Sequence, residues 1–281
     1  MTFTDEEKEI ITKLYSEHHG APYIAKQLNV KEGRVSWYIK RNIGTRSSSE
    51  AARKYNCDEN FFETIDTEEK AYWLGFLYAD GYVSSANAYS YYIGLSISNK
   101  DYNHLEKFKT SLKANHPIHT YKVSNGYNPN SEYCRLLIAS KQLYSDAIKQ
   151  GILEHKTDIL KPPNIEESLI KHFIRGYFDG DGCIAHNTKR NDYTIKILGT
   201  KELLDFIKQF VEDNNIAKIN RYYKRHSDDI VQSLEIGGNF QALKFCDIIY
   251  SDSTIWLDRK HERYISLKKL VASRAVLKKT A

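Results

Sequence analysis

Two aspartates in this chain stand where paired carboxylates could hold a metal ion. Asp80 and Asp181 lie 101 residues apart, each directly before a glycine and at the end of a largely apolar run that predicts a helix. A glycine after a helix suits a left-handed C-terminal cap, so each carboxylate is expected to emerge where its helix ends. The repeated arrangement predicts one site formed by two helix ends.

Small residues in the two runs indicate how the helices could pack. Gly75 with Ala79, and Gly176 with Gly180, stand four positions apart, which places each pair on one helix face. Faces made of small residues let two backbones approach closely. We therefore expect the two helices to lie side by side, with their aspartates at the same end.

Two carboxylates in that position need a compensating charge, because they repel each other and lie beside the negative ends of two helix dipoles. Mg2+ (or Mn2+) would supply it, since Mg2+ takes oxygen ligands, commonly one or two carboxylates together with waters and phosphate oxygens. A cation held by Asp80 and Asp181 could polarise a phosphate, activate water and stabilise the leaving oxygen. The pattern indicates metal-dependent phosphodiester hydrolysis.

The stretches that contain the two aspartates, WLGFLYADG at 73–81 and IRGYFDGDG at 174–182, resemble the LAGLIDADG motif of homing endonucleases. Around each motif the helix and strand patterns follow the family's order, αββαββα, over about residues 66 to 270. The resemblance implies an α+β fold with two tandem pseudo-symmetric repeats. It also implies a monomeric, site-specific endonuclease for double-stranded DNA, with an asymmetric target of roughly 20 base pairs and short 3′ overhangs.

The same resemblance implies roles for single residues. It makes the two aspartates both the metal ligands and the catalytic acids. Lys156 and Lys260, after the last helix of each repeat, match the basic residue that lies near each scissile phosphate and offsets developing negative charge. The acid that the family often has two positions before the catalytic aspartate is present as Asp179, whereas the first copy has Tyr78.

Residues 4 to 43 predict three short helices, the last two joined by a tight turn at Asn29 and Val30. Thr4 with Glu7 three residues later is typical of a capping box. The segment YIAKQLNVKEGRVSWYIK resembles helix-turn-helix modules, whose second helix enters the major groove of DNA. A three-helix unit with a structural role alone is the alternative. The candidates for DNA contact in this segment are Lys31, Arg34, Ser36 and Lys40.

The strands of the two repeats are expected to form curved antiparallel sheets that reach into successive major grooves. One of the predicted strands, KINRYYKR at 218–225, has four basic residues and no acid. Exposed strand faces are often polar whatever they bind, so single base contacts cannot be assigned from this pattern. The side chains expected at the DNA are Lys122, Asn125, Lys189, Arg190, Lys196, Arg221, Lys224 and Arg225.

The chain divides into four predicted segments. They are a helix-turn-helix segment at 1–45, a linker at 46–66, the first repeat at 67–164, and the second repeat with a basic tail at 165–281. The net charge of +5 is modest, but basic residues gather between Lys31 and Lys54 and again after Asp258. One such run can be a solvated helix face, whereas several together favour a polyanionic partner.

Composition narrows the class and the compartment. The four cysteines form no C-x-x-C pair, so the sequence indicates neither a zinc cage nor a disulfide framework. No apolar stretch approaches the roughly 20 residues that span a membrane, and the acidic, polar N-terminus is unlike a signal peptide. We expect an intracellular protein, cytoplasmic or nucleoid-associated, without a membrane partner.

Two other functions fit parts of the same sequence. A LAGLIDADG scaffold without cleavage could act as a DNA-binding transcriptional regulator, although both aspartates are present. The same basic surface could bind the protein's own intron RNA in a maturase role. His116 and His119 have no third ligand placed by sequence, which disfavours an HNH-type nuclease, and the terminal residues are not those of an intein.

Overall fold

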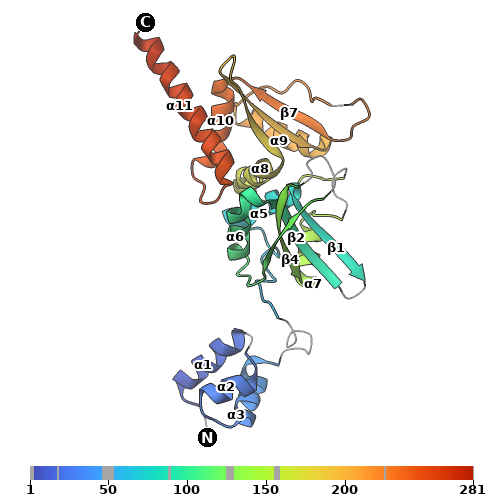
Figure 1. The fold of residues 1–281 in the computed structure, drawn as a ribbon, viewed down its shortest axis with the longest axis vertical. Coiled ribbons are helices and arrows are strands. Elements are labelled where there is room, and N and C mark those ends of the chain that lie inside the picture. Colours follow the sequence, from blue (N-terminus) through green and yellow to red (C-terminus); the bar gives the residue numbers. More distant parts are fainter. Residues whose placement is uncertain are drawn as a thin grey trace. The chain divides into compact units, whose positions relative to one another are not determined.

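The computed structural model of the chain describes residues 3–17, 19–45, 54–87, 90–124, 130–154, 159–224 and 226–280, without the side chains of residues 87 and 275–280. The chain forms two compact units, Met1–Asn56 and Cys57–Ala281 (Figure 1). In the described residues, no helix is both long enough and apolar enough to cross a membrane.

The first unit contains the three predicted helices. They are α1 (Asp5–Ser16), α2 (Ala21–Gln27) and α3 (Glu32–Tyr38), and α3 continues into a π-helical turn, η1 (Ile39–Ile43). The predicted capping box is confirmed: the Thr4 hydroxyl accepts from the backbone of Glu7, and the Glu7 carboxylate accepts from the backbone of Thr4. Asn29, with φ of 52°, makes the tight turn between α2 and α3.

The second unit contains the two predicted repeats in sequence order. The first consists of α5 (Glu68–Ala79), β1 (Gly81–Asn87), β2 (Ser90–Ser98), a short 3-10 turn η2 (Asn99–Asp101), α6 (Tyr102–Ser111), β3 (Ile118–Lys122), β4 (Glu132–Ala139) and α7 (Lys141–Lys149). The second consists of α8 (Glu167–Asp181), β5 (Gly182–Asn187), β6 (Asp192–Gly199), α9 (Lys201–Asp213), β7 (Gln232–Gly237) and α10 (Asn239–Tyr250), followed by α11 (Asp258–Thr280). The predicted α+β class is confirmed.

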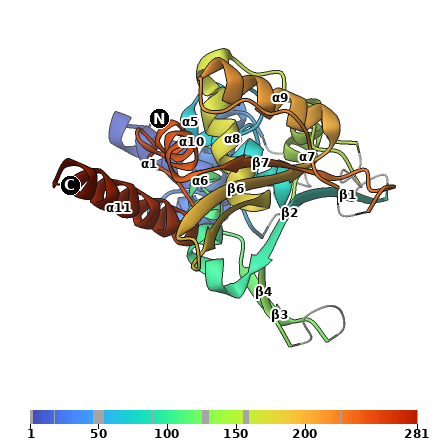
Figure 2. The same ribbon diagram turned by 90° about the horizontal axis from the view of Figure 1, so that it is seen from above.

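Helices α5 and α8 lie side by side at the centre of this unit, with one antiparallel sheet to each side (Figures 1 and 2). The strand orders are β1-β2-β4-β3 and β5-β6-β7. Alternate residues of the central strands, such as Ile93 and Leu95 in β2 and Ile195 and Ile197 in β6, are buried in one continuous core. The intervening polar residues are left on the opposite faces of the sheets.

One boundary differs from the sequence prediction. The units divide after Asn56 and not near Asp66, because Phe61, Phe62 and Ile65 are buried in the core of the second unit. Residues 57–66 are therefore part of that unit and do not act as a linker, while residues 46–53 lie outside the described part of the chain.

The predicted strand at 218–225 was also wrong as a regular strand. Within its described residues, 218–224, the pairing consists of one isolated bridge between Tyr223 and Ser233. The backbone N–H of Ile219 donates instead to the carboxylate of Glu212 at 3.0 Å, which removes it from any strand ladder. The basic residues of this segment thus lie on an irregular edge beside β7.

Candidate active site

The two helices that carry the aspartates meet at their glycines. A methyl group added at Gly75 would lie 2.0 Å from the carbonyl oxygen of Phe173, and one added at Gly176 would lie 1.9 Å from the carbonyl oxygen of Tyr72. Backbone contacts this short leave room for hydrogen alone, so glycine is required on both helices. The predicted close packing of α5 and α8 is confirmed.

This packing brings the two acidic helix ends together. A methyl group added at Gly180 would lie 2.2 Å from Cβ of Ala79 and 3.3 Å from a carboxylate oxygen of Asp80. Asp80, the C-cap of α5, is therefore adjacent to the last turn of α8, which ends at Asp181. Asp80 is exposed and Asp181 is half-buried, so the pair is open to solvent at the end of the helix pair.

The charges of both aspartates act on the pKa of a buried tyrosine. The pKa of Tyr177 is raised well above its usual value, first by burial, then by the charge and hydrogen bond of Asp181, and then by the charge of Asp80. Its hydroxyl donates to the carbonyl oxygen of Leu198 at 2.8 Å. The ring is thus fixed beneath the carboxylate pair and ties α8 to the end of β6.

Lys260 lies beside the pair but points at backbone. Its side chain is buried, and its ammonium donates to the carbonyl oxygens of Phe178 at 2.5 Å and Gly180 at 3.1 Å. Both carbonyls belong to the last turn of α8, and that of Phe178 also accepts from the backbone N–H of the C-cap residue Gly182. Burial lowers the pKa of Lys260 to about 8, although the nearby aspartates, led by Asp179, oppose that shift. A cation at this end also complements the helix dipole.

Asp179 is fully buried and joins four parts of the fold. It accepts hydrogen bonds from the hydroxyl of Tyr250 at 2.5 Å, the hydroxyl of Tyr72 at 2.8 Å and the backbone N–H of Leu257 at 2.8 Å. Burial raises the pKa of this carboxyl, while Lys260 and the three donors act in the opposite direction. Asp179 therefore fixes α8 against α5, α10 and the segment before α11, and it does not share the solvent-exposed site.

Arg175, one helical turn earlier, was not singled out by the sequence. It is fully buried, and its guanidinium donates to the carbonyl oxygens of Ile255 and Ile249, both at 2.9 Å, and to the carboxylate of Glu68 at 2.6 Å. A charged residue within the otherwise uncharged run from Phe173 to Phe178 was the signal available in the sequence. Arg175 fixes the start of α5 and the end of α10 to α8.

The expected DNA-binding residues are distributed over both units. In the first unit, Lys31, Ser36 and Lys40 are exposed on or beside α3, and Arg34 is partly buried. In the second unit, Lys189 and Arg190 are exposed in the turn between β5 and β6. Three expected residues, Lys156, Asn125 and Arg225, lie outside the described residues. The structure therefore does not place Lys156, the expected basic residue of the first repeat.

The remaining basic candidates have local partners on the outer faces and edges of the sheets. Lys196 pairs with Glu235 across β6 and β7 at 2.7 Å, and Lys122 pairs with Glu132 across β3 and β4 at 3.3 Å. The guanidinium of Arg221 lies 4.8 Å from the ring centre of Tyr223. Lys224 is exposed, and its ammonium donates to the carbonyl oxygen of Ser227 at 3.2 Å. Exposed ion pairs of this kind are weak, so phosphates could compete for these cations.

Sequence reasoning missed an aromatic surface on the first sheet. The rings of Tyr121 and Tyr133 stack with centres 6.0 Å apart, and the guanidinium of Arg135 lies 5.7 Å from the centre of Tyr121. The hydroxyl of Tyr121 is 2.7 Å from that of Ser96. These side chains come from β2, β3 and β4 and occupy the face opposite the core.

The carboxylate pair fits a hard divalent cation better than a zinc cage. Among the described residues, no cluster of three or more His, Cys, Asp or Glu side chains could hold a metal. Asp80 and Asp181 provide carboxylate oxygens only, which suits a cation that takes its other ligands from water and phosphate. Zinc in a structural site would need four nitrogen or sulfur ligands.

The geometry defines a protein with two antiparallel sheets around a glycine-packed helix pair that ends in two carboxylates. Residues 168–250 match the family model of a LAGLIDADG-like domain. The homing endonuclease I-GzeII, solved in complex with a DNA target, superposes with a TM-score of 0.51 at 11% identity over 75% of this chain and 92% of its own. The meganuclease I-AabMI gives 0.45 at 15% identity over 72% and 91%. I-SmaMI, bound to uncleaved DNA with calcium ions present, gives 0.47 at 12% identity over 75% and 93%.

No curated protein matches this chain. The chain contains a LAGLIDADG-like domain, and its fold is that of the LAGLIDADG homing endonucleases. The matched residues include the second motif, and the predicted fold of the resemblance is confirmed.

Proposed function

We propose that this protein is a site-specific, metal-dependent endonuclease of the homing type that cuts both strands of double-stranded DNA. The observation that carries the proposal is the meeting of Asp80 and Asp181 at one end of the α5–α8 pair. Each acid comes from one repeat, so a single chain offers one carboxylate to each strand and acts as a monomer. The family match and the fold shared with I-GzeII, which was solved with a DNA target, support this function.

Asp80 and Asp181 would hold Mg2+ or Mn2+ in this function, because their donor set consists of carboxylate oxygens. Bound there, the cation would supply Lewis-acid stabilisation of the scissile phosphate and of the leaving oxygen. Lys260 fixes the end of α8 through the carbonyls of Phe178 and Gly180, and thereby fixes the direction of Asp181. We propose Lys156 as the basic residue of the first repeat.

DNA would lie across the outer faces of the two sheets, with the carboxylate pair between them. Cations on the second sheet and its turns, among them Lys189, Arg190 and Lys196, would contact phosphates. The two sheets carry different side chains, so the preferred target is asymmetric and spans roughly 20 base pairs. In the first unit, α3 would add contacts in a further stretch of major groove.

The same geometry sets the ends of the product. Two acids at one helix-pair end require two scissile phosphates that are close in space, and in B-DNA such phosphates face each other across the narrow minor groove. Phosphates paired across that groove are offset toward their 3′ sides. Cleavage is therefore proposed to leave short 3′ overhangs, and sequencing of the product ends would reveal blunt or 5′-extended termini if the geometry were otherwise.

Cleavage of a defined substrate tests the proposal. The substrate is a linear DNA of the host locus without the inserted gene that encodes this protein, so that the two flanking sequences are joined. It is incubated with the full chain and Mg2+, Mn2+ or EDTA. Asp80→Asn and Asp181→Asn should each lower the cleavage rate by at least about a hundredfold, the scale on which removal of one transition-state interaction slows an enzyme. Binding measured with EDTA should stay intact or tighten, because each change removes a negative charge near phosphate.

Asp213→Asn is the matched control, since it removes an exposed carboxylate at the end of α9 without touching the pair. It should cleave like the unmodified chain. Near-normal cleavage by either active-site variant would rule out the assignment of the acids. Specific DNA binding without cleavage in the presence of either metal would favour a DNA-binding transcriptional regulator instead.

A further inference from the structure

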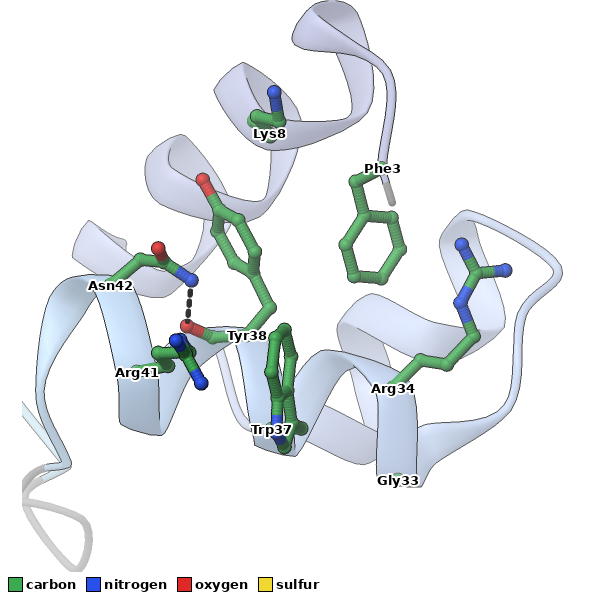
Figure 3. Close-up of a pocket in the computed structure, with 8 residues that line it drawn as sticks. All are labelled: Phe3, Lys8, Gly33, Arg34, Trp37, Tyr38, Arg41 and Asn42. Atoms are coloured by element: carbon green, nitrogen blue, oxygen red, sulfur yellow. Dashed lines mark hydrogen bonds between the residues drawn. The ribbon is translucent and has the colours of Figure 1, made fainter. Parts of the chain in front are cut away.

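The three-helix unit carries a cavity of about 560 Å³, and of the residues expected to contact duplex DNA only Arg34 lines it. Figure 3 shows its walls: Phe3 and Tyr38 lie side by side, Lys8 approaches from α1, and Arg34, Trp37 and Arg41 come from α3 and the turn after it. Arg34, Trp37 and Arg41 are spaced three and four positions apart, which places them on one helix face. The cavity therefore combines one face of α3 with the N-terminal arm and α1.

The lining is positively charged. It contains Lys8, Arg34 and Arg41, and none of the lining residues is acidic. Lys8 pairs with Asp5 at 2.7 Å, but the carboxylate of Asp5 is almost fully exposed, so solvent weakens that pair. The side chains that line the cavity thus carry a net positive charge, which favours an anion.

Arg34 packs on an aromatic ring, but one of its hydrogen-bond donors has no acceptor. Its guanidinium carbon lies 4.5 Å from the centre of the Phe3 ring, which supports the group on an aromatic face. Its Nε atom is buried and has no hydrogen-bond partner among the described residues. A buried donor left without an acceptor is costly, and a turn of the side chain that brings this N–H to a ligand oxygen would relieve that cost.

Trp37 supplies a large aromatic surface beside these cations. It is 59% exposed although it belongs to a helix that contributes to the core of the unit. The guanidinium of Arg41 lies 5.3 Å from its ring centre, which stiffens both side chains at the mouth of the cavity. A base could stack on the exposed indole while its phosphate lies near the two arginines.

We propose that this pocket binds an unpaired nucleotide of a single-stranded nucleic acid. A ligand that is both planar and anionic matches an aromatic wall with three cations, and nucleotides have that chemistry. The base must be unpaired, because in a duplex both faces of each base are covered by its neighbours. Lys31, Ser36 and Lys40 lie outside the pocket lining and are left for duplex contacts.

The test measures binding of short labelled strands to the full chain in EDTA, so that cleavage plays no part. The probes are an oligothymidylate and an oligouridylate of about 12 residues, a strand of the same length that lacks bases, and a duplex. The unmodified chain should bind the thymidylate or uridylate strand more tightly than the strand without bases. Comparison of the first two probes tells whether DNA, RNA or both are accepted.

Trp37→Ala should weaken binding of the preferred single strand by at least about fivefold, the lower end of the effect found for stacking aromatics. It should change binding of the duplex and of the baseless strand by less than about twofold. Arg34→Gln should weaken binding of every single strand, including the one without bases, because it removes a cation that would pair with phosphate.

Two matched controls keep the result specific. Phe240→Ala removes an aromatic of nearly equal exposure, 61%, from α10, and Lys13→Gln removes an exposed cation of α1 that lies outside the pocket lining. Neither should alter binding of single strands. The proposal is overturned if the unmodified chain does not prefer strands with bases, or if Trp37→Ala weakens duplex binding as much as single-strand binding. Both outcomes leave cleavage by the carboxylate pair unaffected.

Discussion

The ammonium of Lys260 donates a hydrogen bond of 3.1 Å to the carbonyl oxygen of Gly180, the residue directly before Asp181. A second bond from the same ammonium goes to the carbonyl of Phe178 at 2.5 Å. Lys260 thus binds the C-terminal turn of α8. Two backbone oxygens fix its position relative to Asp181. A lysine held in this way acts on the active site through the helix end.

Lys260→Met should therefore lower stability and cleavage together. The change removes the ammonium from the carbonyl oxygens of Gly180 and Phe178, of which only that of Phe178 keeps a backbone donor, Gly182 N–H, and the loss is expected to cost about 1–3 kcal/mol of unfolding free energy. Urea unfolding and the cleavage rate measure the two effects. Lys269→Met, an exposed lysine on the same helix, should change neither. Loss of cleavage at unchanged stability would show instead that Lys260 turns toward the phosphate and has no structural role.

The glycine packing between α5 and α8 gives a second prediction. Gly176→Ala would place Cβ 1.9 Å from the carbonyl oxygen of Tyr72, so the two helices would have to separate. Overpacking of this kind typically costs about 1–3 kcal/mol, and it would also move Asp80 away from Asp181. Thermal unfolding should show a lower midpoint, with reduced cleavage. Gly237→Ala is the control, because an added Cβ there meets nothing within 4 Å.

The local features of the site could be predicted from the sequence, whereas the partners of its buried charges could not. Small residues four positions apart and an acid at each helix end depend on spacing within one helix, and the sequence predicts both. The expected left-handed glycine caps do not form, because Gly81 and Gly182 begin β1 and β5 without a positive φ. Arg175 bonds to Ile255, and Asp179 bonds to Leu257, residues that are nearly 80 positions away in the chain. No periodic pattern encodes such contacts, because they depend on how the segment after α10 folds back.

Two other differences have the same cause. Residues 218–225 are predicted as a strand, but a strand needs its backbone donors free, and Glu212 takes that of Ile219. The direction of the Lys260 ammonium likewise depends on the packing of α11 against α8, and a family motif fixes only its place in the sequence. In both cases a tertiary contact decided between conformations that the local sequence allowed.

His104 predicts a dependence of stability on pH. The Tyr72 hydroxyl donates its hydrogen to Asp179, so it accepts from Nε2 of His104, which lies 3.0 Å away. Burial, with the charges of Lys107 and other cations, lowers the pKa of His104 to about 3 from the usual 6.5. The folded protein therefore keeps a neutral imidazole across that interval.

The sign follows from the protons bound in each state. Below pH 6.5 the unfolded chain takes up a proton at this histidine and the folded chain does not, so stability falls as the pH is lowered toward 3. One such group contributes about 1.4 kcal/mol per pH unit. Urea unfolding at about pH 7 and pH 5 should show a smaller decrease in stability for His104→Gln than for the unmodified chain. His226→Gln, which removes an exposed histidine, should keep the original decrease, and an equal decrease in all three would contradict the assignment.

The boundary after Asn56 leads to the last prediction, which separates binding from cleavage. A chain of residues 57–281 keeps Phe61, Phe62 and Ile65 in the core, whereas a chain that starts at Thr67 lacks all three buried side chains. Truncating one buried phenylalanine costs about 3–5 kcal/mol, so the shorter chain should be unstable. The chain of residues 57–281 should fold and still cleave DNA in Mg2+ at high protein concentration, because Asp80 and Asp181 both remain. Its affinity should be lower and should depend less steeply on salt, since each phosphate that the first unit neutralises adds about 0.9 to the logarithmic slope of the full chain. Binding titrations over a salt series measure that slope, and a folded 57–281 chain that kept the full slope would show that the first unit does not bind DNA.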